Sequence, residues 1–335
     1  MTEKKLSCTL VVPARNEESR IGACLREVGA TPLPEGAYWR EWIICDDAST
    51  DGTIVEARKA AASMGFDRLS IRRHENRVRK PLLLQGAHRG LLEHSARDEA
   101  VIAMDADVKP EPQTFRALLQ PFLDDPKLAV VWGDDRPKRS HRRQRPATFQ
   151  MELKAAIARA AGPTAARAYG RLFAYRLDSL RDFEWVPHTV ADDVQLAWFA
   201  RAHNLPVWSA WRATVQVTPA ETLRDFYIQT YREKFKPPFR DADLAPDAHE
   251  RTFAGPAKRA ILTAGASAVA HDPLGAVAYL MYRIAAEVIR RTHPDGDATS
   301  AAVARSTKLP WGEAPGAAGA IASASRRGDE SPAAR

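Results

Sequence analysis

The chain has 335 residues, of which 45% are hydrophobic and 27% charged, a composition typical of soluble globular proteins and unlike that of disordered or membrane-embedded chains. The net charge of +7 predicts an anionic partner, which can be nucleic acid, a phosphorylated substrate or an acidic membrane surface. There is no apolar leader, no run of about 18 apolar residues and no metal-like cysteine spacing, so we expect a cytoplasmic protein with buried free thiols.

The first part of the chain alternates between strands and helices. An apolar run over residues 6–12 predicts a strand, and Asn16 is expected to cap the helix that follows. That helix has apolar residues at the i, i+3, i+4, i+7 spacing of one buried face, namely Ile21, Cys24, Leu25 and Val28. Next come a strand at 41–45, a helix at 54–64 with a capping box of Thr53 and Glu56, a strand at 69–73 and a helix at 81–94.

The segment from Val101 to Val108 is the most informative part of the sequence. Four apolar residues without helical periodicity lead directly into Asp105 and Asp107, so they predict a buried parallel strand. The two carboxylates would then lie just past the carboxyl end of the strand, where open α/β sheets bind ligands. Because buried unpaired carboxylates are costly, we expect them to hold a divalent cation that carries a phosphate.

These elements predict a doubly wound α/β fold. A helix at 112–123, with proline at its first position, and a strand at 128–132 continue the alternation, which implies right-handed crossovers and a mainly parallel sheet flanked by helices. Three strand ends carry polar clusters, at Arg15 and Asn16, at Asp46 and Asp47, and at Asp105 and Asp107. Such ends line one edge of the sheet, so the clusters are expected to meet there. No glycine-rich dinucleotide fingerprint follows the first strand.

The remaining sequence predicts a second half and a helical extension. Expected helices cover 148–161, 194–203 and 221–236, and expected strands cover 170–175, 206–208 and 213–217. Asp134 and Asp135 open a polar loop whose basic residues form either a solvated face or an anion site, namely Arg136, Lys138, Arg139, Arg142 and Arg143. The predicted parts are a domain at 1–240 with halves 1–133 and 134–240, two helices broken at Asp272-Pro273 within an extension at 241–292, and a disordered tail at 293–335.

Four motifs taken together resemble the family-two glycosyltransferases of GT-A fold. They are the Pro-x-x-Asn-Glu turn at 13–17, the Asp-Asp-x-Ser-x-Asp-Gly-Thr turn at 46–53, the basic pair Arg79-Lys80 and the Asp-x-Asp at 105–107. The resemblance continues at Ala191-Asp192-Asp193. It also continues at Gln229-x-x-Arg232, where Glu233 replaces the family's tryptophan. It covers roughly residues 5–236.

The resemblance implies an inverting transferase that uses a nucleoside-diphosphate sugar, of the UDP or GDP type, with Mg²⁺ or Mn²⁺. The implied nucleotide-binding residues are Pro13, Arg15, Asn16, Glu17, Asp46 and Asp47, with Lys80 close to phosphate. Asp105 and Asp107 would hold the metal, Asp193 would be the catalytic base, and Gln229 with Arg232 would support the diphosphate or the acceptor. A cation and a basic side chain suit this chemistry because negative charge develops on the leaving oxygens.

The acceptor would be a sugar, a glycan or a lipid-linked phosphate. The loop at 133–144, called the basic loop below, and the two alanine-rich helices broken at Asp272-Pro273 would allow peripheral contact with the inner face of a membrane. One alternative is a nucleotidyltransferase, which would share the metal carboxylates without needing Asp193. Another is a non-catalytic protein that binds nucleotide or nucleic acid, although the basic loop lacks the interleaved aromatic residues that stack on bases.

Overall fold

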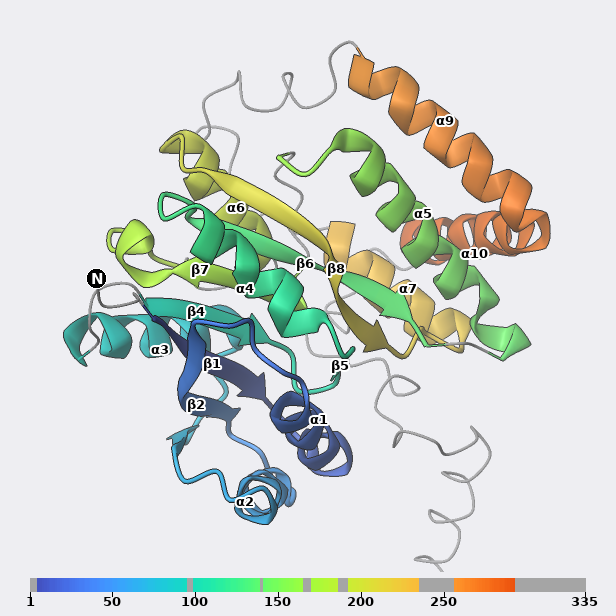
Figure 1. Ribbon diagram of the computed structural model, residues 1–335. Helices are drawn as coiled ribbons and strands as arrows, with labels where there is room; N and C mark the ends of the chain where they lie inside the picture. The colour runs from blue at the N-terminus through green and yellow to red at the C-terminus, as the bar shows by residue number, and fades with distance from the viewer. Residues whose placement is uncertain are drawn as a thin grey trace, which may run out of the picture.

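A computed structural model describes residues 5–94, 99–138, 141–164, 170–185, 192–234 and 256–292. Within these residues the chain forms one eight-stranded sheet with helices on both faces (Figure 1). The strand order is β3-β2-β1-β4-β7-β6-β8-β5. The predicted α/β architecture is therefore present, and most predicted elements lie within a few residues of their expected places.

The strands are β1 (Leu6–Ala14), β2 (Ala37–Asp47), β3 (Leu69–His74), β4 (Glu99–Met104), β5 (Lys109–Pro110), β6 (Val130–Pro137), β7 (Leu172–Arg176) and β8 (Val207–Val217). The helices are α1 (Glu18–Ala30), α2 (Thr53–Ser63), α3 (Lys80–His94), α4 (Thr114–Asp124), α5 (Arg145–Ala161), α6 (Asp192–Ala202), α7 (Leu223–Lys234), α9 (Pro256–His271) and α10 (Pro273–Thr292). The sequence did not predict β5, and the two strands expected at 206–208 and 213–217 are the single strand β8.

The direction of the strands changes across the sheet. β3, β2, β1 and β4 run parallel to one another, as the alternation of strands and helices predicts. β7 then enters antiparallel between β4 and β6, while β8 is parallel to β6 and β5 is antiparallel to β8. The sheet is therefore mixed, and the amino end of β7 lies beside the carboxyl end of β4.

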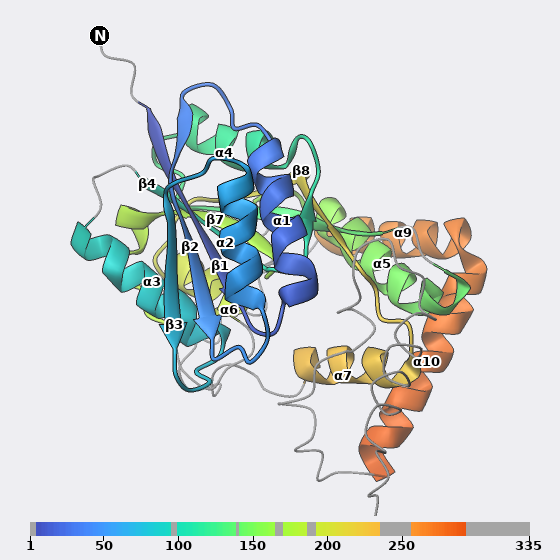
Figure 2. The same cartoon turned by 90° about the horizontal axis from the view of Figure 1, so that it is seen from below.

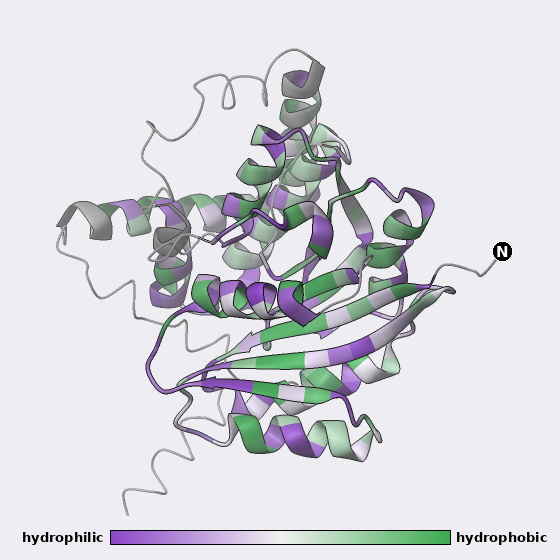
Figure 3. Ribbon diagram, turned by 90° about the vertical axis from the view of Figure 1, so that its left-hand side faces the viewer, coloured by the Kyte–Doolittle hydropathy of each residue, from purple (hydrophilic) through white to green (hydrophobic). Residues whose placement is uncertain are grey.

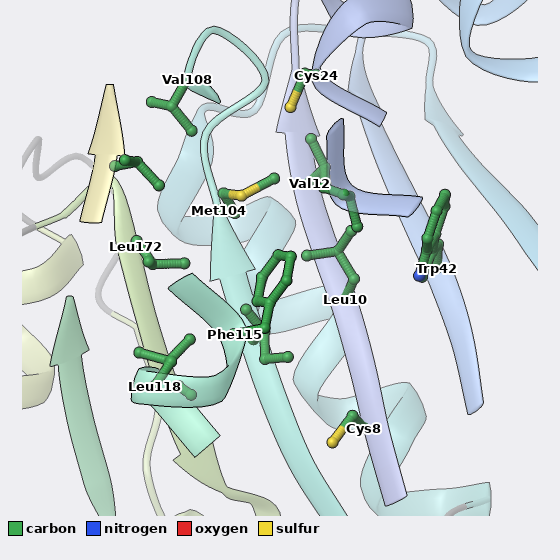
Figure 4. Close-up of a cluster of buried hydrophobic side chains, with 14 of the residues drawn as sticks. Cys8, Leu10, Val12, Cys24, Trp42, Met104, Val108, Phe115, Leu118 and Leu172 are labelled. Atoms are coloured by element: carbon green, nitrogen blue, oxygen red, sulfur yellow. The ribbon is translucent and has the colours of Figure 1, made fainter. Parts of the chain in front are cut away.

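Apolar side chains cover both faces of the sheet. On one face, Leu10 and Val12 of β1 pack with α1, α2 and α4, and on the other face Val11 packs with α3 and α6. Successive side chains of a strand point to opposite faces, so a strand covered on both sides is a continuous apolar run. Figure 4 shows Phe115 of α4 against Leu10 and Met104 in the first of these clusters. In Figure 3 the strands are hydrophobic over much of their length.

The three cysteines are buried and free, as predicted. Burial raises the pKa of Cys8 and of Cys45 to about 12, and it raises the pKa of Cys24 as well. These thiols therefore stay protonated and act as small apolar side chains.

The first turns of α1 and α2 are capped differently from the prediction. Thr53 is the first residue of α2 rather than its cap, and its hydroxyl bonds to Asp51, so it forms no capping box with Glu56. Asn16 does not cap α1, whose preceding residue Glu17 instead donates its N–H to Thr53 Oγ1 at 2.8 Å. The side chains of Asp51, in the loop before α2, and of Thr53, at its first residue, thus satisfy backbone groups at the start of α1. This cross-capping depends on two segments that only the fold brings together.

The start of α4 also differs from the prediction. α4 begins at Thr114, so Pro112 precedes the helix instead of occupying its first position. The Thr114 hydroxyl accepts from the N–H of Glu111 at 2.7 Å and donates to the carbonyl oxygen of Thr214 in β8. These bonds attach the first turn of α4 to the sheet.

Gly133 lies in β6 at a position without room for a side chain. A Cβ atom there would lie 2.7 Å from Leu172 Cδ2 and 2.9 Å from the carbonyl oxygen of Ala213. The Gly133→Ala variant is therefore expected to lose about 1–3 kcal/mol of its free energy of unfolding, because buried neighbours in β7 and β8 would have to move. Urea-induced unfolding measures this loss.

The matched control is Gly86→Ala in α3, where no atom lies within 4 Å of the added Cβ. This exposed helical position should gain up to about 1 kcal/mol, since alanine has the higher helix propensity. Equal stability of the two variants would contradict the packing around Gly133.

The C-terminal helices pack on the second half of the sheet domain. α9 and α10 lie against α5, and α10 also contacts α7 (Figure 2). The ring of Tyr279 lies 5.6 Å from that of Phe149 in α5, and the ring of Tyr282 lies 5.4 Å from that of Phe226 in α7. Among the helices in the described ranges, none has both the length and the apolar character required to span a bilayer.

Candidate active site

The candidate site begins at the carboxyl end of β4. Asp105 and Asp107 follow this strand directly, as predicted. The N–H of Asp105 donates to the carbonyl oxygen of Arg171 at 3.0 Å, one residue before β7 begins. The antiparallel direction of β7 therefore places Arg171 beside the two acids, and the sequence alone did not reveal this.

Lys80 joins two acids that are distant in the sequence. Its Nζ lies 2.7 Å from Asp105 Oδ1 and 3.0 Å from Asp192 Oδ2, and it also donates to the carbonyl oxygen of Gly170 at 2.5 Å. Burial opposes the charge on Lys80, but the two carboxylates outweigh burial and hold the pKa of Lys80 above its ordinary value. Lys80 is therefore a fixed cation at the end of β4.

Asp47 holds the backbone that leads into Lys80. Asp47 Oδ1 accepts from the N–H of Val78 at 2.6 Å and from the N–H of Arg79 at 3.2 Å. Arg79 has a φ of +72°, a strained value for a residue with a side chain. The carboxylate of Asp47 thus stabilises the strained turn that aims Lys80 at Asp105.

One carboxylate oxygen of Asp46 has no hydrogen-bond partner among the described residues. Its side chain is completely buried, and Oδ2 accepts from the N–H of Ser49 at 3.3 Å and lies 3.5 Å from Arg73 Nε. Oδ1 is buried and has no hydrogen-bond partner among the described residues. A buried acceptor without a partner is costly, so Asp46 is the better candidate of the pair for contact with a ligand.

The turn after β1 is fastened to the turn after β2. Asn16 accepts from the N–H of Thr50 at 2.9 Å through Oδ1, and its own N–H donates to Ser49 Oγ at 3.0 Å. Asn16 and Ala48 both have positive φ, at 53° and 54°. Arg15 is half-buried, and its Nη1 is buried without a hydrogen-bond partner among the described residues. The predicted nucleotide-binding turns are therefore adjacent and strained, a combination that is common at functional sites.

Asp107 is surrounded by charges of both signs. Burial and the nearby Asp105 raise its pKa, while Arg171, Arg20 and Lys80 act in the opposite direction. Arg20 of α1 is almost fully buried and donates through Nη1 to the carbonyl oxygen of Asp107 at 3.3 Å. Sequence reasoning missed Arg20, whose only sequence signal is a cation three residues after the Asn16-Glu17 turn.

The predicted metal site fits a cation that is shared with a ligand. The described residues contain no group of three or more His, Cys, Asp or Glu side chains able to hold a metal. Two neighbouring carboxylates nevertheless suit Mg²⁺ or Mn²⁺, since such ions are commonly bound by one or two carboxylates together with phosphate oxygens. The raised pKa of Asp107 indicates that its ionised form lacks sufficient compensating charge, which a divalent cation would supply.

Asp192 and Asp193, the acidic pair at the start of α6, have different surroundings. Asp192 is buried and paired with Lys80, whereas Asp193 lies against Gly170, where a Cβ atom would be 3.0 Å from Asp193 Oδ2. Burial, followed by the neighbouring Asp192, raises the pKa of Asp193 to about 7. A carboxyl group with this pKa can exchange a proton near neutral pH, as a general base must.

Asp134 and Asp135 lie in β6 and not in the loop that the sequence predicted for them. Asp135 Oδ2 lies 2.5 Å from Arg171 Nη1, so it anchors the arginine beside Asp107. Asp134 is fully buried and pairs with Arg159 of α5 at 2.6 Å. Their position after an apolar run was the available signal, because Asp105 and Asp107 follow the apolar run of β4 in the same way.

Lys80→Met is expected to lower the free energy of unfolding of the metal-free protein by about 3 kcal/mol, because it leaves the buried Asp192 and the partly exposed Asp105 without their shared cation. Chemical denaturation in the presence of a chelator measures this effect. Lys59→Met is the control, since Lys59 is 67% exposed in its pair with Glu56 and should have no measurable effect. Unchanged stability of Lys80→Met would contradict the proposed bridge.

The predicted Gln-x-x-Arg element is only partly described. Gln229 lies half-buried in α7, while the side chain of Arg232 lies outside the described residues, as does Ala191 of the Ala-Asp-Asp motif. The roles of Gln229 and Arg232 stay predictions.

Comparison with known proteins identifies proteins that are similar to this chain in sequence and in fold. The chain is 28% identical over 137 residues to dodecaprenyl-phosphate galacturonate synthase of Rhizobium johnstonii, covering 40% of this chain and 38% of that protein. It is 30% identical over 116 residues to dolichol-phosphate mannosyltransferase of Saccharomyces cerevisiae, covering 35% of this chain and 41% of that protein. The chain thus spans about two fifths of the length of these curated relatives.

The fold is similar to that of the mannosyltransferase PcManGT from Pyrobaculum calidifontis, solved in complex with GDP-Man and Mn²⁺. The TM-score is 0.56 at 21% identity, over 85% of this chain and 87% of that one, which supports the predicted GT-A fold. The family model for glycosyl transferase family 2 matches residues 9–183, a segment that contains the ends of β1, β2 and β4 together with Lys80. This match covers more than half of the sequence, and the chain belongs to glycosyl transferase family 2.

Proposed function

We propose that this chain transfers a sugar, with inversion, from a UDP or GDP sugar to an acceptor hydroxyl or a lipid phosphate. The observation that carries the proposal is the position of Lys80, which joins Asp105 after β4 to Asp192 at the start of α6. Asp47 holds the turn before this lysine, so three motifs distant in the sequence act on one place. Family membership supports the same reaction class.

One set of residues would bind the nucleoside, and another set would stabilise the charge of the leaving diphosphate. Asp46 Oδ1, a buried acceptor, would receive a hydrogen bond from the nucleoside, and the buried Arg15 Nη1 is a donor of the kind that ribose or phosphate accepts. Asp105 and Asp107 would hold Mg²⁺ or Mn²⁺, which supplies positive charge for the diphosphate. Lys80 and Arg171 add fixed cations near the leaving oxygens, where negative charge develops during transfer.

Asp193 is the proposed base. Inversion by direct attack requires a carboxylate within hydrogen-bond reach of the acceptor hydroxyl, on the side of the sugar opposite the leaving group. Asp193 is the neighbour of Asp192, whose carboxylate pairs with Lys80. Asp193 is therefore close to the proposed diphosphate region, while the ion pair with Lys80 is made by Asp192. Its pKa of about 7 is suited to accepting a proton near neutral pH.

A lipid phosphate is the acceptor class to test first. Both curated relatives are named for products or acceptors built on polyprenyl phosphates, namely dodecaprenyl phosphate and dolichol phosphate. The chain matches only part of each relative, so the lipid-phosphate acceptor is a proposal that these names and the cations of the site support.

Thermal shift with nucleotides tests the proposal. UDP or GDP should raise the melting temperature in the presence of Mn²⁺, and a ligand at about 100 times its dissociation constant should add about 2.7 kcal/mol of stability. The chelated protein should show a much smaller shift. If no nucleotide stabilises the protein while it binds DNA with a steep salt dependence, the nucleic-acid alternative would replace the transferase.

A further inference from the structure

The outer surface of α10 carries an unusual set of exposed apolar side chains. They are Leu274, Val277, Leu280, Met281, Ile284 and Val288, and each is between 54% and 66% exposed. Five of them recur at alternating spacings of three and four residues, so they form one stripe along the helix. Scattered exposed leucines need no explanation, but a continuous stripe of this length marks an interaction surface.

The opposite side of α10 is attached to the protein. Tyr279 and Tyr282 pack on Phe149 of α5 and Phe226 of α7, and Ala286 is buried. The apolar stripe therefore points away from the sheet domain. We call these six residues the apolar face of α10.

Basic residues lie beside the start of this face. Arg145, the first residue of α5, pairs with Asp272, which accepts at 2.5 Å from Nη2 and at 3.1 Å from Nε. Asp272 also accepts from the N–H of Gly275 at 2.9 Å and so caps the first turn of α10. Arg142 and Arg143, both exposed, are within one helical turn of Arg145. The ion pair thus fastens the basic loop to the end of α10 at which the stripe begins.

We propose that the apolar face of α10, together with Arg142 and Arg143, docks on a bilayer that contains anionic phospholipid. An apolar stripe bordered by cations is the pattern that binds lipid interfaces, with apolar side chains among the acyl chains and cations at the headgroups. A parallel pairing with a second copy of this chain would bring the two sets of arginines together, whereas an anionic bilayer complements both the apolar stripe and the cations. This inference rests on the proposed function in one respect: a lipid-phosphate acceptor would lie in the bilayer on which α10 docks.

Vesicle co-sedimentation tests the docking surface without donor or acceptor. The full chain should sediment with vesicles of phosphatidylcholine and phosphatidylglycerol and much less with phosphatidylcholine alone. The double variant Met281→Ser/Ile284→Ser should weaken binding to the mixed vesicles by at least about tenfold, because two apolar contacts with the bilayer are lost. Arg142→Gln/Arg143→Gln should weaken it by roughly 30-fold, and high salt should reduce the difference.

Val55→Ser is the matched control, because Val55 is 54% exposed on α2, far from α10 in Figure 2. It should sediment like the parent protein. Equal binding by the α10 variant, or no preference for the anionic vesicles, would overturn the proposal. A dimer in solution that the α10 substitutions dissociate, without vesicle binding, would assign the face to a second copy. Thermal shift with UDP or GDP on the same samples tests the transferase site separately, so either idea can fail alone.

Discussion

Asp107→Asn is expected to reduce Mn²⁺-dependent nucleotide binding by at least about 100-fold, because the proposed metal site consists of only two protein carboxylates. The melting temperature of the metal-free protein should stay unchanged or rise slightly. Burial and Asp105 raise the pKa of Asp107, so the ionised carboxylate is a poor stabiliser of the metal-free fold. Calorimetric titration of UDP or GDP, with Mn²⁺ and with chelator, measures the first effect, and thermal unfolding measures the second.

The control for this substitution is Asp178→Asn, at a carboxylate that is 38% exposed, paired with Arg181, and located just after β7 at the edge of the sheet opposite Asp105 and Asp107. It should bind nucleotide like the parent protein. If Asp107→Asn retains full metal-dependent binding, Asp107 is not a metal ligand. If it loses binding together with the fold, the variant reports on structure, and Asp107→Glu should then be used to test metal binding.

Asp193→Asn is expected to keep nucleotide binding and to lose about 10²- to 10⁴-fold in turnover on a hydroxyl acceptor, the usual contribution of a positioned base. The amide keeps the size of the side chain beside Gly170 but cannot accept the proton. Release of UDP or GDP from the nucleotide sugar, in the presence of acceptor, measures turnover. The same samples in a binding titration show whether donor affinity is preserved.

The acidity of Asp193 adds a pH dependence with a definite sign. A base works only when it is deprotonated, and the pKa of Asp193 is raised to about 7, mainly by burial and next by Asp192. Turnover of the parent protein should therefore increase as pH rises through about 7 and then level off. The Asp193→Asn variant should lack this limb, and a parent profile that is flat through neutral pH would argue against Asp193 as the base.

Asp192→Asn distinguishes the two neighbouring acids. Asp192 pairs with Lys80, so its loss should change the position of that cation and weaken donor binding as well as turnover. The opposite pattern is that Asp192→Asn keeps donor binding but loses turnover, while Asp193→Asn turns over at a near-normal rate. This result would assign the role of base to Asp192 instead of Asp193.

Much of the fold could be predicted because its signals are local. The apolar runs of β1, β2 and β4 are bounded by polar turns, and their parallel pairing follows from the helices between them. Asp105 and Asp107 could be placed for the same reason, since a strand that ends in two acids determines on which edge the acids lie. The helix caps were predicted incorrectly at Asn16 and Thr53, because Asn16 accepts from Thr50 in the other turn, while the Thr53 hydroxyl donates to Asp51 and accepts from Glu17.

The sequence by itself determined which residue types stand at the carboxyl ends of the strands, because an apolar run and the polar turn that follows it are properties of short segments. The tertiary structure alone decided which of these residues touch. Insertion of the antiparallel strand β7 beside β4 brings Arg171 to Asp107 and Asp135, and the packing of α3 and α6 on one face of the sheet brings Lys80 to Asp105 and Asp192. Such contacts depend on strand order and on long-range packing, for which short-range sequence patterns carry no signal.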